Sequence, residues 1–541
     1  MTSTRTFPGT GPLQSESRAG GGVTLYEYDD RARVSAIMRG FSATDLLERI
    51  ETTYDPDTGR KNLERMLARD GAAWVEKSRT SYRYDLFARL DQVTNADNST
   101  VGYAYDSAGR IVSVRDENHP APNTFYEYDT GGRLAEVRQA LASAAGGFVT
   151  TLYSYDRDGN LVSVTDPNGN VTTYVYDDFG QLLRQDSPVS GATVYTYNAA
   201  GDLTSSIDAN GAASTRTYDV LGRVLTNVAT RGSESETIAW TYDAGTFGIG
   251  RISSVVEPTG STTYAYDRRG LLQQEQKTIR GTTYTTAFRY DQAGNRTAMT
   301  YPSGNVVTYT FDYAGRPQSA VSGTATIVAS AKYLPFGPRT ELVLGNGTTR
   351  RTSYDQRYRP LVNELITTGG TIARYAYTHD AAGNVMAILD QIDHAYDRTF
   401  GYDDLNRLTV ANSGAALWGS GSYVYDAMGN LESSALGART RQFAYSGNTP
   451  RLTSVTAAGA VRPVTYDAAG NETIDGATYS PRNSLAGNDP YGYAYDARGV
   501  RTITEFASTG TLVSIAAAPA AVRGGESVQG TVTLTEPAPA G

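Results

Sequence analysis

Apolar and polar side chains alternate along short stretches of this chain, and each stretch ends in residues that favour a turn. Tyr153 and Tyr155 are two positions apart, so both rings leave the same face of an extended strand. Asp156 then opens a four-residue turn, in which its carboxylate can bond the backbone two residues on, and Gly159 supplies the positive φ that follows a type I turn. Residues 160–164 alternate again. The pattern predicts a β-hairpin with a glycine bulge.

A second turn signal follows several of the predicted hairpins. Residues 166–169 read Asp-Pro-Asn-Gly, where Pro167 pre-sets φ and Gly169 closes the turn. Related sequences, Glu-Pro-Thr-Gly and Tyr-Pro-Ser-Gly, stand at 257–260 and 301–304. One period of the pattern therefore consists of two strands and two turns.

The first turn signal repeats along most of the chain as a Tyr-Asp or Tyr-Asn pair. Its Asp or Asn stands at 85, 106, 129, 156, 177, 198, 219, 243, 267, 291 and 312, and the pairs return at 403, 426, 467 and 496. Such regular spacing indicates tandem structural repeats, each packing on its neighbours. The residues that we expect to define the repeats structurally are Tyr105, Asp106, Gly109, Tyr155, Asp156, Gly159, Tyr176, Asp177, Gly180, Tyr218, Asp219, Gly222, Tyr266, Asp267, Gly270, Tyr290, Asp291, Gly294, Tyr425, Asp426, Gly429, Tyr466, Asp467, Gly470, Tyr495, Asp496 and Gly499.

The repeated motif, Tyr-x-Tyr-Asp-x-x-Gly-Arg/Asn-Leu with Asp/Glu-Pro-x-Gly between copies, resembles the YD repeats of bacterial RHS proteins, wall-associated proteins and teneurins. The resemblance covers about residues 23–507. It implies an all-β fold in which tandem hairpins form a long coiled antiparallel sheet, a spiral shell or barrel-like ribbon. In family members such a shell often encloses a C-terminal toxin. At about 10 residues per strand and turn, the repeats predict on the order of 40 to 50 strands.

Three segments are predicted along the chain. Residues 1–22 read as a flexible N-terminal segment, 23–507 as the repeat ribbon, and 508–541 as a Pro/Ala-rich tail that resembles the first two strands of a bacterial Ig-like module. Because two such strands cannot form a sandwich, we interpret the chain as a piece of a longer product or a truncated one. The ribbon is irregular at about 40–80 and 325–400. At 40–80 short helices and charged, atypical strands both fit, with strands favoured.

Composition narrows the function classes. The formal net charge of −9 and the scattered basic residues argue against a nucleic-acid partner. The absence of cysteine excludes disulfides and thiolate metal sites, and His119, His379 and His394 are too far apart in sequence for a zinc motif. We find neither a signal peptide nor a run of about 18 apolar residues, so we expect no membrane insertion.

The tyrosines, aspartates and arginines of the repeats each have a possible binding role and a purely structural one. The 39 tyrosines could stack on sugars, although packing along the sheet is the more economical explanation. The turn aspartates could bind calcium, but turn capping explains them and the full EF-hand loop is missing. The arginines after the turn glycine, Arg110, Arg133, Arg223 and Arg316, could form an anion-binding stripe, yet pairing with acidic residues on neighbouring strands is favoured. We therefore predict no metal and no cofactor.

No motif of an enzyme appears. The sequence has no nucleophile elbow and no P-loop, and a glycan-processing enzyme would need an acidic pair that nothing in the sequence singles out. The glycine- and aspartate-rich core motif that is linked with aspartyl self-cleavage in toxin-delivering RHS proteins does not follow residues 496–499. We predict a non-catalytic structural or binding protein that is secreted or displayed on a bacterial surface, with cell-surface glycans as candidate ligands. The alternative is the encapsulating cocoon of an RHS toxin, with an enclosed polypeptide as its partner and the C-terminal effector absent from this chain.

Overall fold

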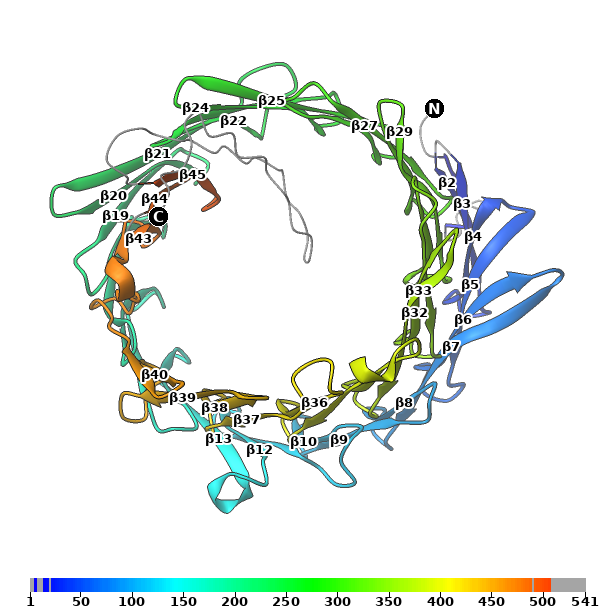
Figure 1. Ribbon diagram of the computed structural model, residues 1–541, viewed down its shortest axis with the longest axis horizontal. Helices are drawn as coiled ribbons and strands as arrows, with labels where there is room; N and C mark the ends of the chain where they lie inside the picture. The colour runs from blue at the N-terminus through cyan, green and yellow to red at the C-terminus, as the bar shows by residue number, and fades with distance from the viewer. Residues whose placement is uncertain (1–3, 7–12, 19–20, 489–490, 507–541) are drawn as a thin grey trace. The chain divides into compact units, whose positions relative to one another are not determined.

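The computed structural model describes residues 4–6, 13–18, 21–488 and 491–506 (Figure 1). This part of the chain contains 45 strands and three short 3-10 helices, η1 (Ala145–Gly147), η2 (His394–Tyr396) and η3 (Ile474–Gly476). Of the strands in the described ranges, 41 belong to one hydrogen-bonded sheet and four to a second sheet, and neighbouring strands pair in antiparallel fashion. The prediction of an all-β fold built from tandem antiparallel hairpins is confirmed. None of the helices in the described ranges is long and apolar enough to cross a membrane.

The chain divides into two compact units, each made of two separate segments. The first unit comprises residues 1–152 and 288–442, and the second comprises residues 153–287 and 443–541. The strands that lie wholly or mostly in the first unit are β1 (Thr4–Thr6), β2 (Ser15–Arg18), β3 (Gly22–Tyr28), β4 (Val34–Ser42), β5 (Asp45–Tyr54), β6 (Lys61–Asp70), β7 (Ala73–Tyr84), β8 (Leu90–Asn95), β9 (Thr100–Tyr105), β10 (Ile111–Arg115), β11 (Thr124–Tyr128), β12 (Leu134–Ala140), β13 (Phe148–Tyr155), β26 (Arg296–Thr300), β27 (Val306–Phe311), β28 (Pro317–Ser322), β29 (Ala325–Tyr333), β30 (Arg339–Leu344), β31 (Thr349–Tyr354), β32 (Pro360–Thr367), β33 (Gly370–His379), β34 (Val385–Asp390), β35 (Arg398–Tyr402), β36 (Leu408–Ser413), β37 (Gly421–Tyr425), β38 (Leu431–Leu436) and β39 (Arg439–Tyr445).

The remaining strands form the second unit. They are β14 (Leu161–Thr165), β15 (Val171–Tyr176), β16 (Leu182–Ser187), β17 (Gly191–Tyr197), β18 (Leu203–Ile207), β19 (Ala213–Tyr218), β20 (Val224–Arg231), β21 (Glu234–Tyr242), β22 (Ile252–Glu257), β23 (Gly260–Tyr266), β24 (Leu272–Ile279), β25 (Thr282–Tyr290), β40 (Leu452–Ala457), β41 (Ala460–Pro463), β42 (Thr478–Tyr479), β43 (Leu485–Asn488), β44 (Tyr491–Tyr495) and β45 (Arg501–Phe506).

The hairpin between β9 and β10 shows how each Tyr-Asp turn is built. The Gly109 N–H donates to the Asp106 carbonyl at 3.1 Å, and the Asp106 N–H donates to the Arg110 carbonyl at 2.9 Å. Gly109 has φ +85°, in the left-handed region, and the register between the strands shifts after Ile111. The turn therefore closes through a residue that glycine occupies with the least strain.

The positive φ at the last position of the Tyr-Asp turn predicts that two substitutions there change the free energy of unfolding in opposite directions. Nothing lies within 4 Å of a Cβ built on Gly109, so Gly109→Ala should cost only the backbone strain, about 1–2 kcal/mol of the free energy of unfolding. Ala88 closes the preceding Tyr-Asp turn with φ +58°, and Ala88→Gly should relieve strain and stabilise the fold by up to about 1 kcal/mol. Urea denaturation of both variants checks the pair, and equal signs would contradict the strain argument.

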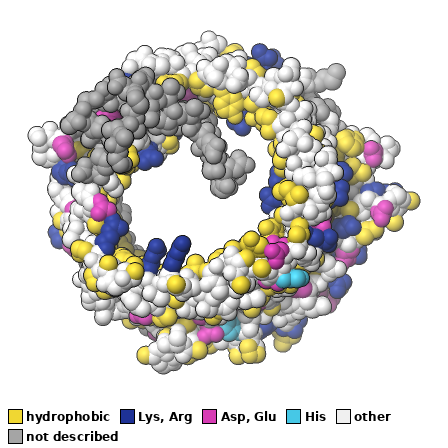
Figure 2. Space-filling model, in the orientation of Figure 1, with side chains coloured by type: hydrophobic (Ala, Val, Ile, Leu, Met, Phe, Trp, Pro, Cys, Tyr) yellow, Lys and Arg dark blue, Asp and Glu magenta, His cyan; other side chains and the backbone are white. Residues whose placement is uncertain are grey.

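Several segments with weak repeat signals are also made of strands. Residues 45–54 and 61–70 form β5 and β6, so strands rather than helices occupy this irregular stretch. The hairpins β4–β5 and β6–β7 project from the first unit, and Figure 2 shows hydrophobic, acidic and basic side chains interspersed on them. Two short strands, β1 and β2, lie within residues 1–22, where the sequence predicts a flexible segment. The predicted Ig-like tail, 508–541, lies outside the described residues.

Within each unit the later segment lies against the earlier one, turn on turn. In the first unit, Arg359 after β31 donates to Asp97 after β8 at 2.8 Å, and Asn118 after β10 donates to Asp380 after β33 at 3.0 Å. In the second unit, Asn483 after β42 donates to Asp208 after β18 at 2.7 Å. Asn118 also donates to Asn406, just before β36, at 3.4 Å, and Figure 1 shows β36 beside β10. Tyr-Asp turns and their equivalents in the later segment thus meet second-type turns of the earlier segment, so the sheet is coiled upon itself in both units.

Candidate functional site

The aspartate of each Tyr-Asp turn is held by its own turn. Asp106 Oδ1 accepts the Arg110 backbone N–H at 2.9 Å, and its Oδ2 accepts Arg110 Nε at 2.7 Å. The backbone hydrogen bond and then the guanidinium hold the pKa of Asp106 below its usual value. The same Asp–Arg pair joins Asp29 to Arg33, Asp85 to Arg89, Asp129 to Arg133, Asp219 to Arg223, Asp312 to Arg316, Asp355 to Arg359 and Asp403 to Arg407.

This pairing corrects the expectation for the arginines. We expected Arg110, Arg133, Arg223 and Arg316 to pair with acidic residues of neighbouring strands, but each pairs with the aspartate four residues before it. Only the turn brings these two positions together, because residues four apart in a straight strand are too distant for an ion pair. Arg223 also contacts Asp243 of the next repeat, and Arg316 also contacts Glu48. In other repeats asparagine takes the position, and Asn160 Nδ2 donates to Asp156 Oδ2 at 2.9 Å.

The repeat tyrosine completes the arrangement. The Arg110 guanidinium lies 4.4 Å from the centre of the Tyr128 ring in the following repeat, within the range of a cation–π contact. The Tyr128 hydroxyl donates to the Ile111 carbonyl at 2.8 Å, directly after Arg110. We name this set of Asp, Arg, Tyr and the carbonyl after the arginine the Asp–Arg–Tyr clasp. It recurs with Asp29, Arg33 and Tyr54, with Asp85, Arg89 and Tyr105, with Asp219, Arg223 and Tyr242, and with Asp312, Arg316 and Tyr333.

The clasp gives the tyrosines of the repeat a structural use. In each clasp one ring face is covered by a guanidinium, and the hydroxyl is bonded to backbone. A sugar that stacked on these rings would have to compete for the same face and the same hydroxyl. The clasp therefore favours the packing explanation at these positions, and it joins each turn to the strand that follows.

Tyr128→Phe tests the clasp. Removal of the hydroxyl leaves the Ile111 carbonyl without this donor and should lower the free energy of unfolding by about 0.5–1.5 kcal/mol. Tyr126→Phe on the same strand is the matched control, since it removes a hydroxyl that is not part of the clasp. Urea denaturation of both variants measures the difference, and equal midpoints would contradict the role of the hydroxyl.

The expected repeat-defining residues are distributed along both units. Their aspartates and glycines lie in turns, and the hydroxyls of Tyr105, Tyr218 and Tyr266 donate to the carbonyls of Leu90, Leu203 and Ile252. Two of the aspartates differ from the others in their surroundings, because one lines a cleft and the other is buried. Asp291 lines a cleft of the first unit, and Asp496 is buried in the second unit with 1% of its surface exposed.

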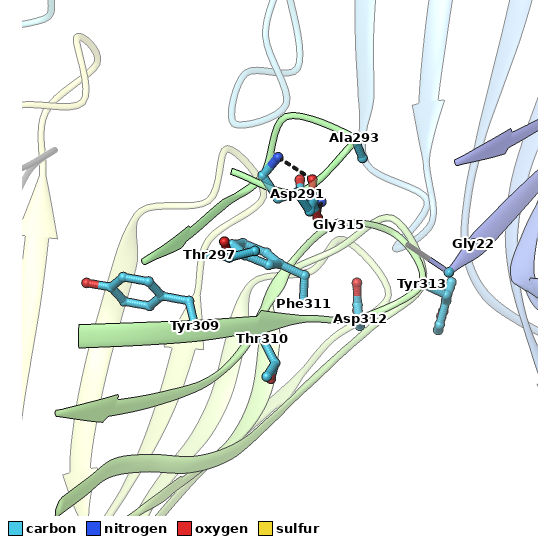
Figure 3. Close-up of a pocket in the computed structure, with 12 residues that line it drawn as sticks. Gly22, Asp291, Ala293, Thr297, Tyr309, Thr310, Phe311, Asp312, Tyr313 and Gly315 are labelled. Carbon is cyan, nitrogen blue, oxygen red and sulfur yellow. Dashed lines mark hydrogen bonds between the residues drawn. The ribbon is translucent and has the colours of Figure 1, made fainter. Parts of the chain in front are cut away.

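The cleft of the first unit has a volume of about 310 Å³ and lies where Gly22 meets the turn after β27 (Figure 3). A Cβ at Gly22 would lie 2.0 Å from the Tyr313 carbonyl oxygen, so only glycine permits this approach. The two aspartates that line the cleft are engaged in their own turns, Asp291 with Asn295 at 2.8 Å and Asp312 with Arg316 at 2.7 Å. A ligand in this cleft would therefore meet mainly hydroxyl groups, because both carboxylates are already hydrogen-bonded within their own turns.

Sequence reasoning missed a buried carboxylate in the first unit. Glu48 on β5 is 2% exposed, and its Oε1 accepts hydrogen bonds from the Tyr313 hydroxyl and from Arg316, both at 2.5 Å. Its Oε2 accepts the Phe336 N–H at 2.9 Å. Burial, and then the bond to Glu48, raise the pKa of Tyr313 above its usual value. Nothing in the local pattern marks Glu48, because its partners are more than 260 residues away. In the described ranges no group of three or more His, Asp and Glu side chains could hold a metal ion.

The fold is a series of tandem antiparallel hairpins, and the clasp repeats along it at the Tyr-Asp turns. The family model of the teneurin YD-shell matches residues 21–245, and that of the RHS repeat matches residues 290–327. The predicted resemblance to the YD-repeat and RHS-repeat family is thereby confirmed. A search of curated protein sequences finds no match.

Solved structures share the fold. The crystal structure of TcdB2-TccC3-TEV aligns with a TM-score of 0.78 and 17% identity, over 96% of this chain and 31% of that chain. The structure of the Photorhabdus luminescens Tc holotoxin pore aligns with a TM-score of 0.72 and 16% identity, over 95% of this chain and 29% of that one. This chain therefore spans about a third of the length of each of these two chains.

Proposed function

We propose that this chain forms part of the wall of a YD-repeat shell that encloses a polypeptide, and that it works outside the cell that produces it. The observation that carries the proposal is the contact of turn on turn within each unit, because it joins successive passes of the sheet into a continuous layer. The fold similarity to the TcdB2-TccC3 structures supports it, since there a chain about three times as long contains the same fold.

The chemistry of the repeats suits a wall. The Asp, Arg and Tyr side chains that recur most often are bonded to each other or to backbone, so they stabilise the sheet itself. Each contact is small, but nearest-neighbour contacts add up along a repeat array. Such a layer would separate an enclosed polypeptide from proteases and from solvent outside.

Cryo-electron microscopy of the product purified from its native host, with the gene intact, tests the proposal. We expect density for additional polypeptide surrounded by the repeat layer, and we expect that polypeptide to survive limited proteolysis until urea opens the layer. A repeat layer with only solvent on both faces, together with no protease-protected fragment, would overturn the proposal. Binding to cell-surface glycans stays a prediction, and a glycan array without signal above background would remove it.

A further inference from the structure

A buried lysine lies between two carboxylates in the second unit. The chain has four lysines, Lys61, Lys77, Lys277 and Lys332. The Lys277 side chain, on β24, is 5% exposed, and those of Asp496 and Glu257 are 2% exposed. Lys277 Nζ lies 2.5 Å from Asp496 Oδ2 and 3.6 Å from Glu257 Oε1. Three ionisable groups thus share one site that excludes water.

The surroundings of Asp496 differ from those of the other Tyr-Asp turns. Its Oδ1 accepts the backbone N–H groups of Arg498 and Val500, both at 2.9 Å, as the turn requires. Position 500 is valine, whereas most other Tyr-Asp turns carry there an arginine or asparagine that binds Oδ2. The Oδ2 atom therefore faces Lys277, with Arg498 farther away at 3.3 Å. The two N–H donors would polarise the carboxyl carbon and stabilise negative charge on Oδ1 during attack by a nucleophile.

Glu257 is fixed beside this pair. Its Oε2 accepts the Ala497 N–H at 2.6 Å, and its Oε1 accepts the Thr259 hydroxyl at 3.1 Å. These bonds hold the carboxylate next to Lys277 Nζ, in position to accept and return a proton. A lysine amine is a nucleophile once it loses its proton, whereas the guanidinium of arginine stays charged.

We propose that Lys277 and Asp496 become joined by an isopeptide bond, with Glu257 relaying protons. The Lys277 ammonium gives a proton to Glu257, and the neutral amine attacks Cγ of Asp496. The Nζ–Cγ bond forms and the Cγ–Oδ2 bond breaks. Oδ2 leaves as water with two protons that come from Nζ, passed on by Glu257, which ends unchanged as a carboxylate. Oδ1 becomes the amide oxygen and keeps its bonds to the Arg498 and Val500 N–H groups.

The resting state of the pair fits this sequence of steps. Burial works to raise the pKa of Asp496, but the bond from Lys277 and the backbone donors outweigh it, and the pKa is lowered overall. Lys277 and Asp496 form an ion pair in the structure, so proton transfer from Lys277 precedes the attack. The bond would tie β24 to the turn between β44 and β45 across 219 residues of sequence, in a chain that has no cysteine for a disulfide. Figure 1 shows β44 and β45 beside β20 and β21 of the same unit.

Mass spectrometry of the full chain tests the proposal. We expect an intact mass lower than that of the sequence by one water. We also expect one branched tryptic peptide that joins residues 270–280 to residues 483–498. The sequence mass, with these two regions recovered as separate peptides from folded protein, would overturn the proposal.

Three variants separate the bond from a simple ion pair. Lys277→Arg keeps the positive charge and should show the full sequence mass. Glu257→Gln keeps both reacting groups and should greatly slow the mass loss. Asp496→Asn should form the same bond with loss of ammonia in place of water, and yield the same branched peptide. The wild-type mass decides the question even where a variant fails to fold.

Discussion

Glu48→Ala is expected to destabilise the first unit by about 3–5 kcal/mol, because it removes one member of a buried, hydrogen-bonded charge cluster. The substitution would leave three donors facing the vacated space, namely the Tyr313 hydroxyl, the Arg316 guanidinium and the Phe336 N–H. All three come from the later segment of the unit, whereas Glu48 comes from the earlier one. The loss should therefore fall on the contact between the two segments.

Urea denaturation followed by circular dichroism measures the overall effect, and hydrogen exchange of residues 306–344 locates it. Glu127→Ala is the matched control, since Glu127 is 60% exposed and lies 3.5 Å from Arg138, so its loss should cost about 0–1 kcal/mol. Glu48→Gln, which keeps an acceptor without the charge, should fall between the two. Equal effects of Glu48→Ala and Glu127→Ala would show that the buried cluster does not hold the segments together.

The repeat itself could be predicted from sequence because its causes are local. Asp106 and Gly109 determine their turn through bonds within five residues, and the alternation on either side determines which face each strand presents. The same logic extended to the irregular stretch at 45–54, where strands were favoured over helices. Hairpin identity, strand number and fold class all follow from contacts of this kind.

The pairing of side chains was less predictable. The arginine after each turn glycine was expected to contact a neighbouring strand, yet the turn folds it back onto its own aspartate. The tyrosine that it covers belongs to the following repeat, which a pattern of single residues does not reveal. The clasp is thus a consequence of the repeat period, since strands of matched length bring Tyr128 over Arg110.

Contacts between the earlier and the later segment of each unit could not be predicted from the sequence. Glu48 meets Arg316 across 268 residues, and Lys277 meets Asp496 across 219. How far the sheet travels before it meets itself depends on its accumulated twist, not on any local motif. The burial of Glu48 or Lys277 can therefore be recognised only from the folded structure, in which distant segments of the sheet lie against each other.

Alkaline pH is expected to unfold the protein between about pH 10 and pH 12, because ionisation of the repeat tyrosines favours the unfolded chain. Burial, aided by nearby carboxylates, raises the pKa of Tyr264 and of Tyr358 to about 12. Burial also raises the pKa of clasp tyrosines such as Tyr105, Tyr242 and Tyr333. A group whose pKa is raised by folding stabilises the fold fully below its unfolded pKa of about 10, and that stabilisation is lost as pH rises through the folded value.

Tyrosinate absorbance and far-ultraviolet circular dichroism, recorded together as the pH is raised, test this expectation. The tyrosines should ionise cooperatively, at the pH where the strand signal is lost. Tyr264→Phe removes one group that ionises more readily in the unfolded chain and should move the midpoint to higher pH, whereas Tyr396→Phe, at a position 41% exposed, should leave it unchanged. Gradual ionisation near pH 10 with the sheet intact would mean that the tyrosines are accessible to water. The hydroxyl bonds of the clasp would then not be required to hold the repeats together.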